Sequence, residues 1–148
     1  VMENILVGAI YGRSRSEKVK ETPKEIAARV SEFLGLADKN DRPASSLTLA
    51  DRKRLEVARA LATDPQLLLL DETMAGLNPV EVEAVMNQVR RIRDQGVTVF
   101  VIEHVMKAVM ALSNRIMVLH HGSKIAEGNP SEIAKNQKVI DAYLGERY

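Results

Sequence analysis

Two adjacent acidic residues follow an apolar run near the middle of the sequence. Residues 67–70 are four leucines, and Asp71 and Glu72 come directly after them. An aspartate at the end of a buried strand can hold Mg²⁺ directly or through water, and a neighbouring carboxylate can polarise an attacking water, as phosphoryl transfer requires. A buried strand that simply emerges into solvent gives the same pattern. Taken alone, the two acids leave both interpretations open.

The segments around these acids favour the chemical interpretation. Residues 47–51 precede a helical pattern, residues 75–78 follow the acids, and His104 comes at the end of the next apolar run. Four elements in this order are more specific evidence for a phosphoryl-transfer site than a strand that ends in two acids.

Helix starts can be located from local capping patterns. Three segments carry a capping residue, a proline and then a glutamate: Thr22-Pro23-x-Glu25, Asn78-Pro79-x-Glu81 and Asn129-Pro130-x-Glu132. This pattern is typical of the first turn of a helix. With the apolar periodicity that follows, it predicts helices over residues 23–34 and 79–95. A weaker capping box, Thr48-x-x-Asp51, predicts a helix over residues 51–62.

Two short runs, residues 66–71 and 97–102, have the composition of parallel strands buried on both faces. The helix over residues 79–95 joins them into a right-handed βαβ unit, so the fold class is α/β. The carboxyl ends of parallel strands share one sheet edge, which is where ligands bind. Asp71-Glu72 and Glu103-His104 should therefore meet there. Residues 115–119 and 124–127 predict a hairpin, and residues 12–21 a polar loop or helix start.

Composition excludes several other classes of protein. The 148 residues carry 21 basic and 20 acidic side chains, a net charge of +1, which argues against a dedicated nucleic-acid binder. The absence of cysteine excludes disulfides, thiolate nucleophiles and Cys-ligated zinc. The apolar runs are far shorter than the ~20 residues that a membrane span requires. His120 and His121 are interpreted as turn residues, not as a metal site.

The sequence resembles the ATP-binding subunit of ABC transporters, and more narrowly that of branched-chain amino acid importers. The resemblance runs from Val1 to Tyr148 and is carried by residues 55–61, 67–72, 101–104 and 139–145. It implies a partial P-loop NTPase (RecA-like) three-layer core with parallel strands, plus a helical subdomain. Residues 1–62 would be mainly the helical subdomain with the signature-motif region. Residues 63–148 would be the C-terminal half of the core with Walker B, D-loop, switch histidine and tail.

The resemblance also implies roles for particular residues. Asp71 would be the Walker B acid on Mg²⁺, Glu72 the catalytic glutamate and His104 the γ-phosphate sensor. Residues 75–78 would be the D-loop, whose expected nucleotide contacts are Gly76 and Asn78. The signature position, which would contact ATP in trans, is filled by Thr48, Leu49, Ala50 and Asp51.

The chain departs from the family pattern at three places. Leu49, Ala50 and Asp51 stand where glycines and a glutamine are expected, which implies a weakened trans contact, and Asn78 replaces the usual aspartate. No G-x-x-x-x-G-K-[ST] pattern occurs in the 148 residues. The nearest imitation, residues 8–14, is one residue short and has an arginine for the lysine. We expect the chain to be the C-terminal part of a cassette, inactive alone and with exposed strand edges.

The leading hypothesis is an ATP-hydrolysing motor fragment of an ABC importer for branched-chain or related amino acids. ATP and Mg²⁺ would be its cofactors. Its partners would be a second ABC ATPase subunit and transmembrane permease subunits, at the cytoplasmic face of the inner membrane, without nucleic acid and without membrane insertion. The alternative is a nucleotide-independent interaction module that docks on a permease or sister subunit. An ABC-type ATPase of DNA maintenance is disfavoured by the neutral charge and the importer-like tail.

Overall fold

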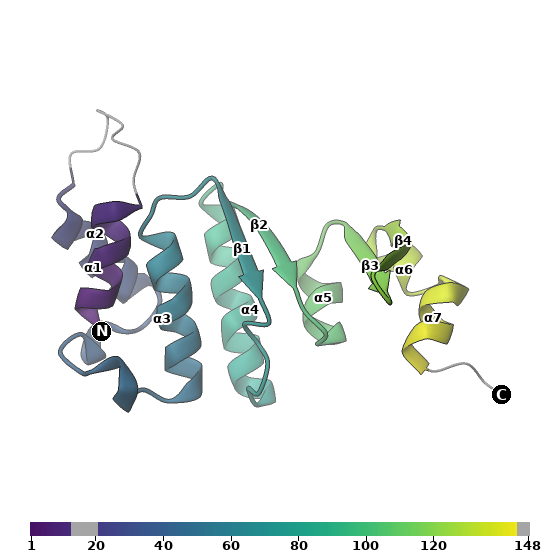
Figure 1. Ribbon diagram of the computed structural model, residues 1–148, viewed down its shortest axis with the longest axis horizontal. Coiled ribbons are helices and arrows are strands. Elements are labelled where there is room, and N and C mark those ends of the chain that lie inside the picture. Colours follow the sequence, from purple (N-terminus) through teal and green to yellow (C-terminus); the bar gives the residue numbers. More distant parts are fainter. Residues whose placement is uncertain (13–20, 145–148) are drawn as a thin grey trace. The chain divides into compact units, whose positions relative to one another are not determined.

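The computed structural model describes residues 1–12 and 21–144, which form two compact units. The first unit, Val1–His104, contains α1 (Met2–Tyr11), α2 (Pro23–Phe33), the 3₁₀ turns η1 (Ala37–Lys39) and η2 (Ala44–Ser46), α3 (Leu49–Leu61), β1 (Leu67–Asp71), α4 (Pro79–Asp94) and β2 (Thr98–Ile102) (Figure 1). The second begins at Val105 and contains α5 (Met106–Leu112), β3 (Ile116–His120), β4 (Ser123–Gly128), α6 (Pro130–Ile133) and α7 (Gln137–Leu144). The polar loop predicted over residues 12–21 lies almost entirely outside the described residues.

The three helix starts predicted from a capping residue, a proline and a glutamate are confirmed. Complete capping boxes at Thr22, Asn78 and Asn129 begin α2, α4 and α6, although α6 lasts only one turn. Helix α3 begins at Leu49, two residues before the predicted start. Thr48 caps it by accepting the Asp51 N–H at 3.2 Å, but the Asp51 carboxylate pairs elsewhere, so only half of the predicted box forms.

Helices α1, α2 and α3 bury a shared apolar interior. A Cβ at Gly8 would lie 2.4 Å from the Arg59 carbonyl oxygen, so only glycine allows α1 to approach α3 this closely. Gly8 therefore serves helix packing, in agreement with the rejection of residues 8–14 as a phosphate loop. The buried apolar side chains of this part include Ile5, Ala9, Ile26, Ala27, Val30, Leu34, Leu36, Leu55 and Ala58.

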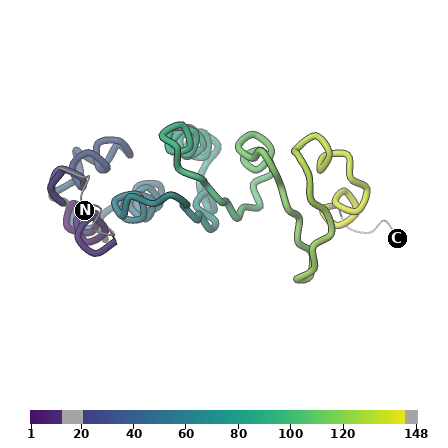
Figure 2. Tube along the Cα trace, turned by 90° about the horizontal axis from the view of Figure 1, so that it is seen from above, coloured from purple at the N-terminus to yellow at the C-terminus, as the bar shows by residue number. Residues whose placement is uncertain are grey.

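Strands β1 and β2 pair in parallel, as predicted, from Leu67 opposite Thr98 to Asp71 opposite Ile102. Helix α4 is the crossover between them and lies beside the strands in both Figure 1 and Figure 2. Leu68 and Leu70 of β1 are buried. The apolar side of α4 is also buried, through Val82, Val85, Met86, Val89 and Ile92.

The expectation that both faces of these strands are buried is wrong for the described chain. Leu67, Leu69, Phe100 and Ile102 alternate with the inward residues and remain 47–65% exposed. Successive strand residues point to opposite faces, so a sheet covered on one side alone leaves every second side chain in solvent. Among the described residues of this unit, no segment covers that second face.

The second unit contains the predicted hairpin. Strands β3 and β4 are antiparallel, and Ile116, Ile133 and Val139 form the unit's buried core, against which Met110 and Val118 pack. Within the described part of the chain, no helix is both long and apolar enough to cross a membrane. The two compact units meet after His104 in the sequence. The predicted boundary at residue 62 separates the helical subdomain from the core of the family fold, which is a different division, so it stays a prediction.

Candidate functional site

The acids at the end of β1 occupy an exposed edge of the sheet. Asp71 is the last residue of β1, and the Glu72 N–H continues the pairing by donating to the Ile102 carbonyl at 2.9 Å. Glu72 has a positive φ of 47°, a left-handed conformation that costs a non-glycine residue on the order of 1 kcal/mol. Such a conformation persists only where surrounding contacts impose it, and it turns the chain out of the strand just at the second acid.

Glu72 and His104 come together across the two strands. His104 Nδ1 lies 3.6 Å from Glu72 Oε1, and the two side chains are 67% and 61% exposed. At this distance the pair makes no hydrogen bond. Both groups therefore remain available to a ligand or to a water molecule placed between them. The βαβ geometry predicted from the sequence brings these two residues to one place.

Glu103 is a further residue at this edge, and no pattern in the sequence assigned it a role. Its Oε1 accepts the Met74 N–H at 2.7 Å, a bond that links positions 29 residues apart. The bond ties the segment that carries His104 to the loop that carries Glu72. An acidic residue at the carboxyl end of a parallel strand was the available signal.

The predicted D-loop, residues 75–78, ends at the residue that caps α4. The Asn78 Oδ1 accepts the N–H groups of Val80 and Glu81, both at 3.0 Å, so this oxygen is committed to the helix cap. Gly76 has a φ of +77°, and a Cβ there would lie 3.1 Å from Leu49 Cδ2. The structure thus brings together two predicted site segments, the signature position and the D-loop, within one chain.

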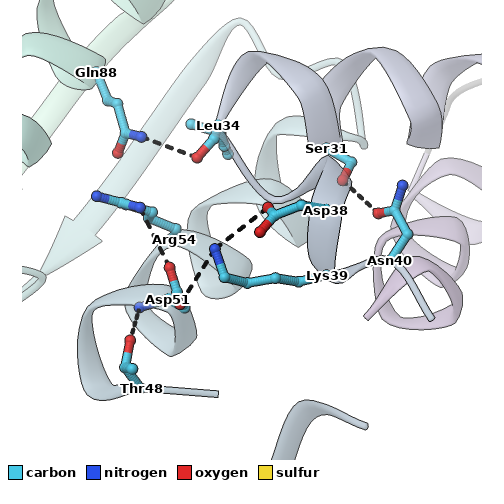
Figure 3. Close-up of polar contacts among 9 residues, drawn as sticks. All are labelled: Ser31, Leu34, Asp38, Lys39, Asn40, Thr48, Asp51, Arg54 and Gln88. Atoms are coloured by element: carbon cyan, nitrogen blue, oxygen red, sulfur yellow. Dashed lines mark hydrogen bonds and ion pairs between the residues drawn. The ribbon is translucent and has the colours of Figure 1, made fainter. Parts of the chain in front are cut away.

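The predicted signature position includes Asp51, which is held by the ion-pair network drawn in Figure 3. Asp51 is only 7% exposed, and its carboxylate lies 3.3 Å from Arg54 Nη1 and 3.6 Å from Lys39 Nζ. Two cations therefore offset the negative charge that would otherwise disfavour an anionic ligand. Ala50 is also buried, whereas Leu49 is 45% exposed.

The donor set at the end of β1 fits Mg²⁺. Magnesium in nucleotide sites is usually held by one or two carboxylates, with phosphate oxygens and water completing the shell. Asp71 supplies one exposed carboxylate, and Glu72 stands next to it. Among the described residues, no group of three or more His, Cys, Asp or Glu side chains is placed to hold a metal by itself. Magnesium here would depend on phosphate ligands.

The fold and the site define a class of protein. A helical part followed by a βαβ unit with Asp-Glu and Glu-His at one edge is the arrangement of part of an ATP-binding cassette. The family model described as "ABC transporter" matches residues 2–75, half of the chain. The model described as "Branched-chain amino acid ATP-binding cassette transporter" matches residues 123–148. The chain belongs to the ABC transporter family.

Its relatives are ATP-binding proteins of amino acid transport. The chain is 39% identical to the high-affinity branched-chain amino acid transport ATP-binding protein LivG of Salmonella typhimurium, with 99% of this chain and 62% of the relative covered. It is 42% identical to the corresponding protein BraF of Pseudomonas aeruginosa, with 97% and 56% covered. The chain thus spans about three fifths of the length of these relatives.

Solved structures give the same result. A nucleotide-free ATP-binding cassette from an ABC transporter superposes with a TM-score of 0.83 at 31% identity, with 98% of this chain and 62% of that chain covered. A cassette in its ADP conformation superposes with a TM-score of 0.80 at 30% identity, with the same coverage. The predicted fold class, a partial cassette with parallel strands and a helical part, is confirmed.

Proposed function

We propose that the chain is part of the ATP-hydrolysing motor subunit of an ABC importer for branched-chain or related amino acids. The observation that carries the proposal is the meeting of Glu72 and His104, 3.6 Å apart, at the sheet edge where Asp71 ends β1. The names of the relatives support the amino acid class of the solute.

In this proposal Glu72 acts as the general base. Its exposed carboxylate accepts a proton from the water that attacks the γ-phosphate of ATP. The imidazole of His104, on the neighbouring strand end, hydrogen-bonds the γ-phosphate or the attacking water and so places the phosphate within reach of Glu72. Asp71 would hold Mg²⁺, which supplies charge stabilisation for the transferred phosphoryl group. Because the 148 residues contain no phosphate-loop pattern, a further segment would supply that loop.

The signature position and D-loop would face a second ABC ATPase subunit. Thr48 to Asp51 begin α3, and the N–H groups of a helix start favour an anionic ligand. The side chains of Leu49 and the buried Ala50 restrict the access of a ligand to those N–H groups. The contact to ATP held by the second subunit would therefore be weakened. Permease subunits would be the other partners, with the motor subunit peripheral to the membrane at its cytoplasmic face.

The test uses a complete cassette in which a phosphate-loop segment precedes this chain. Glu72→Gln should reduce ATP turnover by orders of magnitude while it leaves ATP binding intact, because a general base acts mainly on the transition state. His104→Ala should also lower turnover with little change in stability. Glu56→Gln, at an exposed position on α3, is the matched control. Turnover in Glu72→Gln equal to that of the control would remove Glu72 from this role.

A further inference from the structure

The strongest feature that the proposed function does not use is the contact between Glu103 and Met74. Glu103 Oε1 accepts the Met74 N–H at 2.7 Å, a short distance typical of a charge-assisted hydrogen bond. The bond joins the two segments of the site, since Met74 lies two residues after Glu72 and Glu103 is adjacent to His104. It is a direct side-chain link between them, whereas Glu72 and His104 themselves stay beyond hydrogen-bond distance.

The surroundings of this bond make it hard to replace. Met74 is 1% exposed, and Thr73 before it is 4% exposed, so the loop that follows Glu72 is packed into the protein. Glu103 Oε2 is buried and has no hydrogen-bond partner among the described residues. Without the Glu103 side chain, the buried Met74 N–H would lose its acceptor, and protein interiors strongly disfavour an unpaired N–H group.

The site itself shows why such a fixed contact is needed. Glu72 and His104 are largely exposed and make no hydrogen bond with each other at 3.6 Å, so their own side chains do not hold them together. Glu72 also sits in a left-handed backbone conformation that needs support from its neighbours. The Glu72 N–H bond to the Ile102 carbonyl fixes one side of Glu72, and the Glu103 bond to Met74 fixes the other.

We propose that Glu103 is a positioning residue that locks the loop after Glu72 to the segment that carries His104. It thereby keeps the general base and the phosphate-contacting imidazole in register. This inference rests on the proposed function and adds a residue to it. Glu103 touches neither nucleotide nor water in this role, and it acts on the rate of hydrolysis through the geometry of its two neighbours.

The decisive comparison separates side-chain length from charge. Glu103→Gln keeps the length and a carbonyl oxygen that can accept the Met74 N–H, whereas Glu103→Asp keeps the charge and withdraws the acceptor by one methylene. In the complete cassette we expect Glu103→Asp and Glu103→Ala to lower kcat for MgATP by about 10- to 100-fold, the range that small misplacement of catalytic groups produces. KM should change little, and Glu103→Gln should retain most of the activity.

Val30→Ala is the control for a general loss of stability, because Val30 is buried in α2, a helix that carries no residue of the site. Its kcat per folded protein should equal that of the unmodified cassette. The loss from Glu103→Ala should also be smaller in a His104→Ala background, since residues that act through one geometry are not additive.

Three results would overturn the inference: unchanged kcat in folded Glu103→Asp, an equal loss in Val30→Ala, or a Glu103→Gln variant as impaired as Glu103→Asp. The proposed function is judged separately in the same assay. If the unmodified cassette hydrolyses ATP and Glu72→Gln does not, a failure at Glu103 leaves the proposed function standing.

Discussion

The ion-pair network at the signature position gives a quantitative prediction for Asp51. Replacing Asp51 with asparagine keeps the shape of the side chain and removes the charge that faces Arg54 at 3.3 Å and Lys39 at 3.6 Å. The Asp51 side chain is 10% exposed, and those of Lys39 and Arg54 are 20% and 23% exposed. The pairs are therefore neither fully buried nor freely solvated.

The magnitude follows from this intermediate burial. Exposed ion pairs contribute about 0–1 kcal/mol, whereas removal of one partner of a fully buried pair costs about 3–5 kcal/mol. Without the Asp51 charge, Arg54 loses this partner and Lys39 keeps only Asp38, at 3.4 Å, so Asp51→Asn should lower the free energy of unfolding by about 2 kcal/mol. For a protein of this size the corresponding decrease in Tm is about 4–8 °C.

Urea denaturation followed by circular dichroism is the appropriate assay, because guanidinium chloride would screen the pairs under study. Asp41→Asn is the matched control, an exposed aspartate two residues after Lys39 in the sequence. It should change the free energy of unfolding by less than about 0.5 kcal/mol. If Asp51→Asn falls within about 0.5 kcal/mol of this control, the network does not stabilise the helical part and the reasoning is refuted.

Three further predictions test other parts of the chain. Hydrogen bonds from Lys124 and Arg115 hold the pKa of the Glu127 carboxyl below its ordinary value. The ionised carboxylate therefore stabilises the fold fully above the ordinary pKa, and this stabilisation is lost as the pH falls through the lowered pKa. An NMR titration should show the lowered pKa, and Glu127→Gln should flatten the acid side of the curve of stability against pH. Asn78→Ala removes the acceptor of two N–H groups and should cost about 1 kcal/mol in the unfolding free energy, which thermal denaturation can measure. Replacement of both Leu69 and Phe100, on the exposed sheet face, with serine should reduce self-association of the 148-residue chain, as measured by sedimentation velocity. Unchanged self-association would show that this face is not the contact surface.

Local patterns in the sequence predicted the helix starts and the strand pairing. In each capping box the side chain and the backbone group that it caps lie within three residues of each other. The boxes of Thr22 with Glu25 and of Asn78 with Glu81 can therefore be recognised without any knowledge of the tertiary structure. The parallel pairing of β1 and β2 follows from one helical crossover between two apolar runs. The proximity of Glu72 and His104 is a direct consequence of that pairing.

The contacts that the sequence did not reveal are long-range or depend on what covers a surface. Glu103 and Met74 are 29 residues apart, and the acidic residue after β2 gave no sign of which N–H it would accept. The pairing of Asp51 with Lys39 depends on how η1 folds back beside α3. The exposure of Leu69 depends on which segments pack against the sheet, and strand periodicity carries no information about that.

The departures from the family pattern at the signature position are matched by their neighbours. Asp51 introduces a negative charge, and Lys39 and Arg54 offset it. Leu49 introduces a bulky side chain, and a Cβ on Gly76 would lie 3.1 Å from its Cδ2, so glycine at position 76 avoids a tight contact with the leucine. Gly76 also has a left-handed φ of +77°, which disfavours any other residue for an independent reason. Leu49 and Asp51, at the predicted signature position, are therefore integrated into the packing and charge balance of the helical part. Their functional effect should lie in the approach of a ligand to the start of α3, while the fold that presents Asp71, Glu72 and His104 is preserved.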